Sequence, residues 1–170
     1  MTSTEPRELT DRSVLLSLQE ITEEIGVDGP DRTPQDVGEA AALLSELLAA
    51  AGLASQAPGR LVGGDEALAR GSARRVLERL AVDEDTAAAT RAVLSDPPAD
   101  EQLSVEAAAA GAVVLGAVVA WLQTKIDIRI RRRNGETEFE FRLTKASSEP
   151  GTLRRLGSVI AELLTGPPQP

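Results

Sequence analysis

The sequence contains no cysteine, no histidine and no tyrosine. Without cysteine the chain forms neither disulfides nor thiolate metal sites, and cysteine usage does not indicate whether its compartment is oxidising or reducing. Without histidine it lacks His-ligated zinc sites, the Ser–His and Cys–His nucleophile pairs and the commonest general base. An enzyme would have to work with carboxylates, arginine, lysine and hydroxyls, and no catalytic constellation of these is recognisable. We therefore expect a protein without catalytic activity, cofactor or bound metal.

Aromatic residues are also scarce, and Trp121, Phe139 and Phe141 are the whole set. Platforms that stack the bases of single-stranded nucleic acid need exposed aromatic side chains. The formal net charge is −9 and is unevenly placed, because residues 1–104 carry a net −11 and residues 105–170 a net +2. An acidic surface repels nucleic acid and anionic lipid, so no nucleic-acid partner is expected.

Four helices are predicted in an acidic N-terminal unit over residues 7–94. Apolar residues recur there at spacings of three and four, which is typical of helices that bury one face. Helix starts are indicated at Thr33-Pro34 and at Asp65 by their capping side chains. The stretch 54–64 is expected to be a loop. The predicted helices span residues 7–25, 33–51, 65–80 and 83–94.

A linker is predicted at residues 95–102, where SDPPADEQ contains two prolines and three acids. It would separate the acidic unit from a second unit over residues 103–164, which consists of a helix, a hairpin and a last helix. Residues 165–170 are expected to form a disordered tail, and residues 1–6 a disordered start. The first residues, MTSTEPREL, have neither a basic nor an apolar stretch, so no signal peptide is expected and the cytoplasm is the predicted compartment.

The segment from Lys125 to Lys145 predicts a β-hairpin. A two-residue type I′ turn needs positive φ at both central positions, which Asn134-Gly135 tolerates best. Folding about that turn gives one apolar face and one face of oppositely charged pairs. A slip of one residue would mix the faces, so the register is strongly specified. The predicted pairs are Ile130–Phe139, Ile128–Phe141 and Ile126–Leu143 on the apolar face, and Arg131–Glu138, Arg129–Glu140 and Asp127–Arg142 on the charged face.

The predicted hairpin is incomplete on its own, because two strands are marginally stable in water. Its apolar face needs a cover, for which Trp121-Leu122 and the helix from Thr152 are the expected elements. Its edges need shielding or partners. They would either pair across a two-fold axis, to form the four-stranded sheet of a homodimer, or receive a strand from a partner protein.

The longest uncharged run, residues 107–122, has two interpretations. At 16 residues it is shorter than the roughly 20 that a membrane span needs, and longer than many buried helices. Small residues at spacing four, Ala108, Ala112, Gly116 and Ala120, permit close packing both in a protein core and in a membrane. A buried core helix is favoured, and a short membrane span is the alternative.

The candidate interaction residues are Arg132, Arg133 and Asn134 at the hairpin tip. Arg129 and Arg131 face glutamates in the predicted register, whereas Arg132 and Arg133 have no predicted partner. One interpretation is a site for an anion, a phosphate or an acidic partner. The favoured interpretation is that these charges are simply solvated.

Two further patterns each have two interpretations. The triplet Asp83-Glu84-Asp85 has the oxygen ligands of a hard cation, but acids also favour the start of a helix. Gly63-Gly64 before a helix offers backbone N–H groups to an anion, but no dinucleotide or P-loop motif surrounds it. Helix start and plain loop are the favoured interpretations.

The C-terminal third resembles a known family. Its order is an Ala/Val/Leu-rich helix ending in Trp121-Leu122, a basic strand from Ile126 to Arg133, a glycine turn and a second strand. This order is similar to the effector-associated constant component family and to other small accessory proteins of bacterial conflict systems. The resemblance implies a non-enzymatic partner that holds or localises an effector, and it assigns no functional residues. Residues 7–94 match nothing in that pattern.

These patterns predict an α+β fold, mostly α, with one antiparallel β-hairpin. The predicted function is that of a non-enzymatic accessory or adaptor protein that binds a partner effector protein, in a bacterial conflict or signalling system. The alternative is a membrane-anchored accessory component that uses residues 107–122 as a short span, with the hairpin in the cytoplasm.

Overall fold

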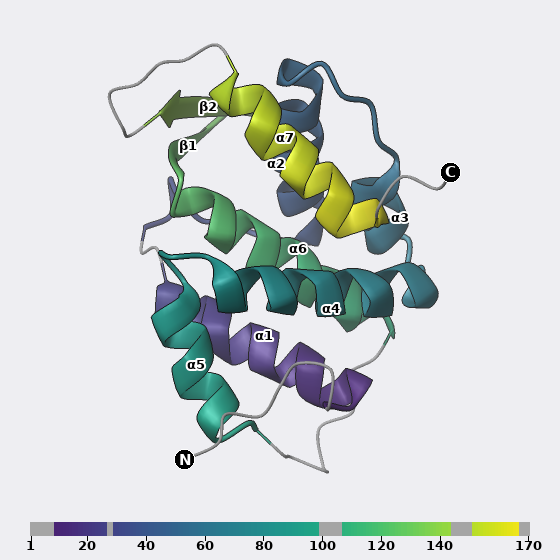
Figure 1. Ribbon diagram of the computed structural model, residues 1–170. Helices are drawn as coiled ribbons and strands as arrows, with labels where there is room; N and C mark the ends of the chain where they lie inside the picture. The colour runs from purple at the N-terminus through teal and green to yellow at the C-terminus, as the bar shows by residue number, and fades with distance from the viewer. Residues whose placement is uncertain (1–8, 27–28, 99–106, 144–150, 167–170) are drawn as a thin grey trace.

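The described part of the fold is mostly α-helical with an antiparallel hairpin, as the sequence predicts (Figure 1). The computed structural model describes residues 9–26, 29–98, 107–143 and 151–166. The helices are α1 (Asp11–Ile25), α2 (Val37–Ala50), α3 (Ala57–Val62), α4 (Glu66–Val82), α5 (Ala87–Ser95), α6 (Ala107–Gln123) and α7 (Thr152–Thr165). The strands are β1 (Ile126–Arg133) and β2 (Glu136–Leu143).

Helix α6 is the centre of the molecule. It packs against α1, α2, α3 and α4, and Figure 1 shows it passing through the middle of the helical bundle. Val114, Leu115, Val118 and Leu122 on it are completely buried. Apolar side chains nearly all round a helix need neighbours on several sides, and here the N-terminal helices supply them. The run 107–122 is therefore a core helix, and no helix in the described part of the chain is long and apolar enough to cross a membrane.

One hydrophobic core joins the two predicted units. It contains buried residues of α1, α2 and α4 together with those of α6, β1 and α7. The predicted boundary at 95–102 is consequently not a boundary between separate cores. The part of that linker beyond residue 98, the predicted disordered start at 1–6, and the part of the predicted tail beyond residue 166 lie outside the described residues. Thr165, assigned to that tail, is the last residue of α7.

Local capping explains where two helices begin. The Asp65 carboxylate accepts a hydrogen bond from the Leu68 N–H at 3.0 Å, and α4 follows it as predicted. The predicted start of α2 at Thr33 is wrong, because Asp36 is the residue that caps this helix, accepting from the Glu39 N–H at 2.8 Å. The predicted loop 54–64 is also partly wrong, since α3 lies within it and has Pro58 in its first turn.

Two glycines permit the closest contacts between helices. A Cβ on Gly111 of α6 would lie 2.2 Å from the carbonyl oxygen of Leu61 at the end of α3. A Cβ on Gly157 of α7 would lie 2.5 Å from the Cβ of Ala51. Side chains at these positions would push the elements apart, so glycine sets the spacing of α6 and of α7 from their neighbours.

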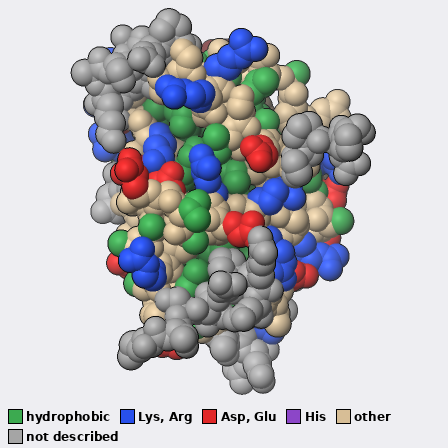
Figure 2. All heavy atoms as spheres, viewed as in Figure 1, with side chains coloured by type: hydrophobic (Ala, Val, Ile, Leu, Met, Phe, Trp, Pro, Cys, Tyr) green, Lys and Arg blue, Asp and Glu red, His purple; other side chains and the backbone are tan. Residues whose placement is uncertain are grey.

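The outer face formed by α4 and α7 is mixed in character. Figure 2 shows apolar side chains interspersed with basic and acidic ones over this face. Val82 at the end of α4 is 76% exposed and is one of the two large hydrophobic residues that stand out in the described part of the surface. Isolated apolar residues of this kind are normal on protein surfaces and do not by themselves mark an interface.

Candidate functional site

The turn of the hairpin has the predicted geometry. Asn134 has φ 52° and Gly135 has φ 78°, which is the left-handed pair that a type I′ turn requires. The observed register matches the prediction at every pair from Ile126–Leu143 to Arg131–Glu138. Alternation along the strands then separates an apolar face from a charged face.

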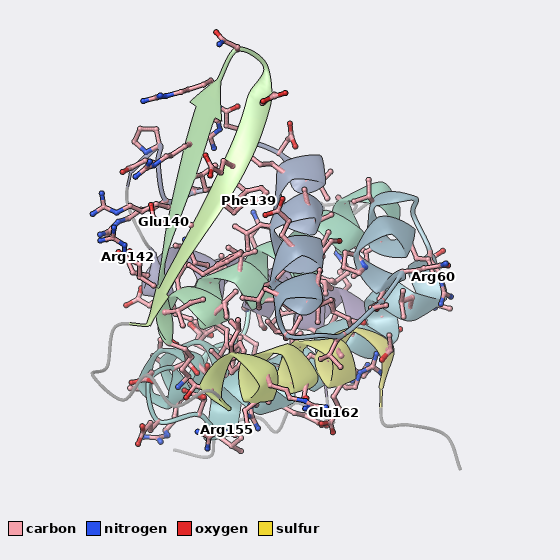
Figure 3. All side chains as sticks on the ribbon, turned by 90° about the horizontal axis from the view of Figure 1, so that it is seen from above. Arg60, Phe139, Glu140, Arg142, Arg155 and Glu162 are labelled. Atoms are coloured by element: carbon pink, nitrogen blue, oxygen red, sulfur yellow. The ribbon has the colours of Figure 1, made fainter. Side chains whose placement is uncertain are left out.

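The apolar face is covered by helices, but not by both of the expected ones. Ile126, Ile128 and Ile130 of β1 are buried, at most 3% exposed, whereas Phe139 and Phe141 of β2 are only half-buried. β1 packs against α6, and β2 packs against α2 (Figure 3 shows Phe139 on the side of α2). The expectation that the helix from residue 152 is a lid is wrong, because α7 packs chiefly against α2, α3 and α4.

The charged face forms ion pairs between diagonal neighbours and along a strand. Glu140 lies 3.1 Å from Arg131 and 2.8 Å from Arg142, and both Glu140 and Arg142 are on the side opposite Phe139 (Figure 3). Asp127 approaches Arg129 at 3.8 Å. The hydrogen bond from Arg142, helped by the neighbouring arginines, lowers the pKa of Glu140. The predicted neutralisation of this face therefore occurs, but through different partners from the residues directly opposite.

Arg132 is not a free binding group, contrary to prediction. Its guanidinium makes two parallel hydrogen bonds to Glu39 of α2, each 2.7 Å, and donates to the carbonyls of Pro30 at 2.6 Å and Thr33 at 3.1 Å. A bidentate arginine–carboxylate pair is among the stronger polar contacts available. The hydrogen bond from Arg132 lowers the pKa of Glu39, and that of Arg132 is raised in turn. Arg132 thus fastens the hairpin to α2 and to the loop before it.

Arg133 and Asn134 remain exposed at the tip, as predicted. Arg133 is opposite Glu136 in the register, and Asn134 forms the turn. The structure therefore separates the three candidate residues, because Arg132 is engaged internally while the other two face solvent.

The two edges of the hairpin differ. The Ile130 N–H donates to the carbonyl of Asp31 at 2.7 Å, so the loop before α2 is bonded to the outer edge of β1 at this residue. The Gln123 side chain donates to the next carbonyl of that loop, on Arg32, and holds the loop against α6. Nothing in the local sequence of either segment predicts the bond between Ile130 and Asp31, which joins residues 99 positions apart.

The outer edge of β2 stays open in the described part of the molecule. The N–H of Ile130 points away from β2, so Ile130 and Phe139 form a non-hydrogen-bonded pair of the hairpin. In such a pair the backbone N–H and C=O of both residues point outward, and those of Phe139 therefore point to the outer edge of β2. By alternation the same holds for Thr137 and Phe141. No backbone hydrogen bond from another described residue reaches these groups. An edge of this kind is a template for a further strand.

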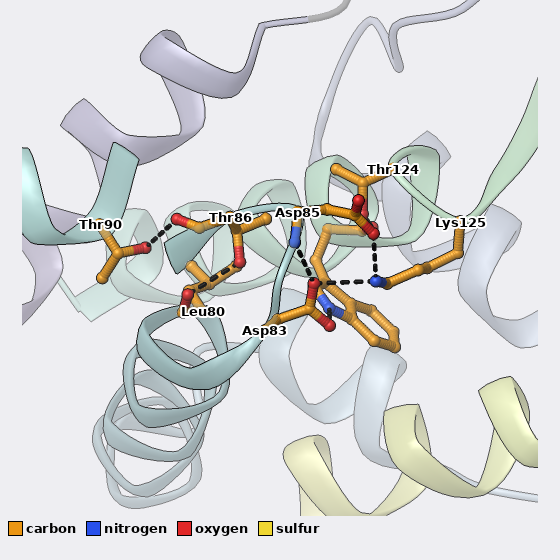
Figure 4. Close-up of polar contacts among 8 residues, drawn as sticks. Leu80, Asp83, Asp85, Thr86, Thr90, Thr124 and Lys125 are labelled. Atoms are coloured by element: carbon orange, nitrogen blue, oxygen red, sulfur yellow. Dashed lines mark hydrogen bonds and ion pairs between the residues drawn. The ribbon is translucent and has the colours of Figure 1, made fainter. Parts of the chain in front are cut away.

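The acidic triplet before α5 has a structural role. The Asp83 carboxylate accepts hydrogen bonds from Lys125 Nζ at 2.8 Å, Trp121 Nε1 at 3.1 Å and the Asp85 N–H at 3.0 Å (Figure 4). Asp85 also accepts from Lys125. The oxygens of Asp83 are thus engaged by protein donors, and no group of three or more potential metal ligands occurs among the described residues. The predicted helix start is shifted as well, since α5 begins at Ala87.

Electrostatics in this cluster favour the ionised forms. Burial alone would raise the pKa of Asp83, but hydrogen bonds from Lys125, Trp121 and the backbone outweigh it and hold the pKa below the ordinary value. Burial would lower the pKa of Lys125, but the hydrogen bonds to Asp83 and Asp85 raise it. The cluster thus ties the end of α4 to the junction of α6 and β1.

Comparison with known proteins gives no relative. No family model, no curated protein and no solved structure matches this chain. The open edge of β2 and the half-buried phenylalanines beside it are the features of the described residues that suggest a binding role.

Proposed function

We propose that the chain is a non-enzymatic accessory or adaptor protein, which binds a strand of a partner polypeptide along the open edge of β2. The observation that carries this proposal is the asymmetry of the hairpin. The loop carbonyl of Asp31 accepts the outward N–H of Ile130 in the middle of the β1 edge, while the outward groups of Thr137, Phe139 and Phe141 on β2 have no backbone partner among the described residues. Strand addition supplies affinity through main-chain hydrogen bonds and specificity through alternate side chains.

The side chains beside the edge support this assignment. Phe139 and Phe141 are half-buried, whereas their cross-strand partners Ile130 and Ile128 are buried. An added strand with apolar residues at alternate positions would continue the apolar face and cover the exposed part of both rings. Every second residue of that strand would meet the charged face, where Glu138, Glu140 and Arg142 offer both signs.

The nature of the partner rests on the resemblance of the C-terminal third to the effector-associated constant component family. On that ground we propose an effector protein of a bacterial conflict system as the partner, in the cytoplasm. The rigid mounting of the hairpin supports a holding role, because Arg132 ties it to α2 and buried isoleucines tie it to the core. If β2 were mobile, part of the binding free energy would be lost in ordering it when the partner strand binds.

The test is affinity capture from a lysate of the source organism, with quantitative mass spectrometry of the bound proteins. Thr137→Pro removes one outward N–H without touching the hydrogen bonds inside the hairpin. Thr137→Val keeps that N–H and changes only the exposed side chain. We expect the proline variant to capture about tenfold less of the partner than wild type, and the valine variant to capture as much as wild type. The reason is that proline both removes a hydrogen-bond donor and places its ring in the path of the added strand. Equal capture by both variants would contradict docking at this edge.

A further inference from the structure

We propose that the edge of β2 is filled, in the isolated protein, by β2 of a second copy, in one antiparallel register centred on Phe141. The inference rests on the proposed function in one respect, which is that the β2 edge is the docking element. It adds the identity of the occupant and the residues that face each other. A partner strand would then have to replace this second copy.

The backbone permits such pairing. Phe139 and Phe141 have outward N–H and C=O groups, so a second β2 running antiparallel can exchange hydrogen bonds with them. A two-fold axis through Phe141 places this residue opposite itself as a hydrogen-bonded pair. Phe139 is then opposite Leu143 of the second copy, and the rows of the apolar face continue without interruption across four strands.

Charge complementarity selects this register. With Phe141 on the axis, Glu140 faces Arg142 of the second copy, and Arg142 faces its Glu140. In the hairpin, Arg129 is opposite Glu140 and Asp127 is opposite Arg142. The row across the four strands would therefore read Arg129, Glu140, Arg142 and Asp127, with the sign of the charge alternating at every step. Opposite charges directly across a sheet stabilise it, and like charges destabilise it.

The neighbouring registers lack this property. An axis through Phe139 brings Glu138 opposite Glu140 of the second copy, and an axis through Glu140 brings that residue opposite itself. An axis through Arg142 sets two arginines against each other. Registers shifted by half a step place apolar residues opposite charged ones. Phe141 is thus the centre at which β2 is complementary to itself over the described strand.

A charge-exchange experiment tests the register. Glu140→Arg alone sets two arginines opposite each other at both symmetric contacts, and Arg142→Glu alone does the same with two glutamates. We expect each variant alone to raise the dissociation constant of the dimer by about tenfold or more, measured by sedimentation equilibrium. Mixing the two variants sets an added arginine opposite an added glutamate on one side and the native pair on the other. Native mass spectrometry should then show the heterodimer, with near wild-type affinity.

Because the chain has no cysteine, a disulfide gives a second and independent test. Phe141→Cys places two thiols across the axis, where Cα atoms of a hydrogen-bonded pair are about 5.5 Å apart, within the range of a disulfide. Thr137→Cys on the same strand would leave the two thiols about 26 Å apart. Mild oxidation should cross-link the first variant and not the second.

Several results would overturn the inference. They are a wild-type protein that is monomeric at about 50 μM, a concentration at which even a weak dimer is populated; single charge variants that dimerise normally; and cross-linking of Thr137→Cys in place of Phe141→Cys. If the protein is a monomer but Thr137→Pro still reduces the capture of a partner, the inference fails and the proposed function stands. If the protein is a dimer but Thr137→Pro and Thr137→Val capture a partner equally, the proposed function alone fails.

Discussion

At the scale of single residues, Gly111 shows how closely the core is fitted. Its missing side chain lets the backbone of α6 approach the last turn of α3, where the nearest atom is a carbonyl oxygen and not the flexible end of a side chain. Gly116, five residues further along the same helix, has no neighbour within 4 Å of the position of an added Cβ. The two glycines therefore offer a matched pair for testing the packing of the central helix.

We expect Gly111→Ala to lower the free energy of unfolding by about 1–3 kcal/mol, because either α3 or α6 must move to admit the methyl group. Gly116→Ala should change it by no more than about 1 kcal/mol, and in the stabilising direction, since alanine favours helix. Urea denaturation followed by circular dichroism measures both. Equal effects of the two substitutions would show that α3 does not approach α6 as described.

Arg132 shows what local sequence leaves out. Its place beside a turn predicts a solvated charge, and its neighbour Arg133 fulfils that prediction. Arg132 itself is bound by Glu39, which lies 93 positions away in the chain. Nothing in the sequence around Glu39 indicates that it receives an arginine from the hairpin. Long-range ion pairs of this kind are not encoded in the periodicity of either partner.

At the scale of elements, the hairpin was the most predictable part of the chain. The Asn134-Gly135 turn and the alternation of residues are local, and each excludes competing registers. The cover of its apolar face was predictable only in part. Only three residues separate Trp121-Leu122 from β1, and α6 does pack on that strand, whereas α2 and the loop at Asp31 come from distant sequence. Amphipathic faces show that a helix packs on something, but not on which element.

The junction between α4, α6 and β1 makes a prediction about pH. The pKa of Asp83 in the folded protein is below its unfolded value of about 3.9, so its ionised form stabilises the fold above that pH. That contribution is lost as the pH falls through the folded pKa. The difference in the free energy of unfolding between wild type and Asp83→Asn should accordingly be constant near pH 6 and shrink below about pH 4.

The measurement is urea denaturation at a series of pH values, and Glu84→Gln is the control. Glu84 is the exposed neighbour of Asp83 in the same triplet. Because the contacts with Lys125 and Trp121 belong to Asp83, substitution of Glu84 should give a much smaller difference from wild type near pH 6. A constant difference for Asp83→Asn over the whole range would mean that the contacts with Lys125 and Trp121 do not depend on the charge of Asp83.

At the scale of the whole molecule, the position of α6 determines cooperativity. The helix belongs by sequence to the C-terminal part, yet the N-terminal helices surround it. Composition suggested two units because the charge changes between residues 104 and 105. The distribution of charge describes the residues that face solvent, and it does not indicate which apolar faces pack together in the core. This is the physical reason why the predicted boundary does not divide the core.

We expect the protein to unfold in a single transition. Trp121, the only tryptophan, lies at the end of α6 and is 1% exposed, so its fluorescence reports on the centre of the core. Far-ultraviolet circular dichroism reports on all helices together. The two signals should give the same urea midpoint and the same slope, as two-state unfolding requires. Separate midpoints would favour two independently stable units instead.

The bond from Ile130 to Asp31 has a consequence for aggregation. A hairpin with both edges free can add strands without limit, and its assembly is an open-ended fibril. Here the Asp31 carbonyl already accepts the outward N–H of Ile130, so the loop before α2 obstructs the addition of a strand on the β1 side. A strand from a partner would still present its own outer edge, whereas a second hairpin brings a β1 edge that is obstructed in the same way. A dimer of hairpins joined through β2 would therefore be a closed four-stranded sheet.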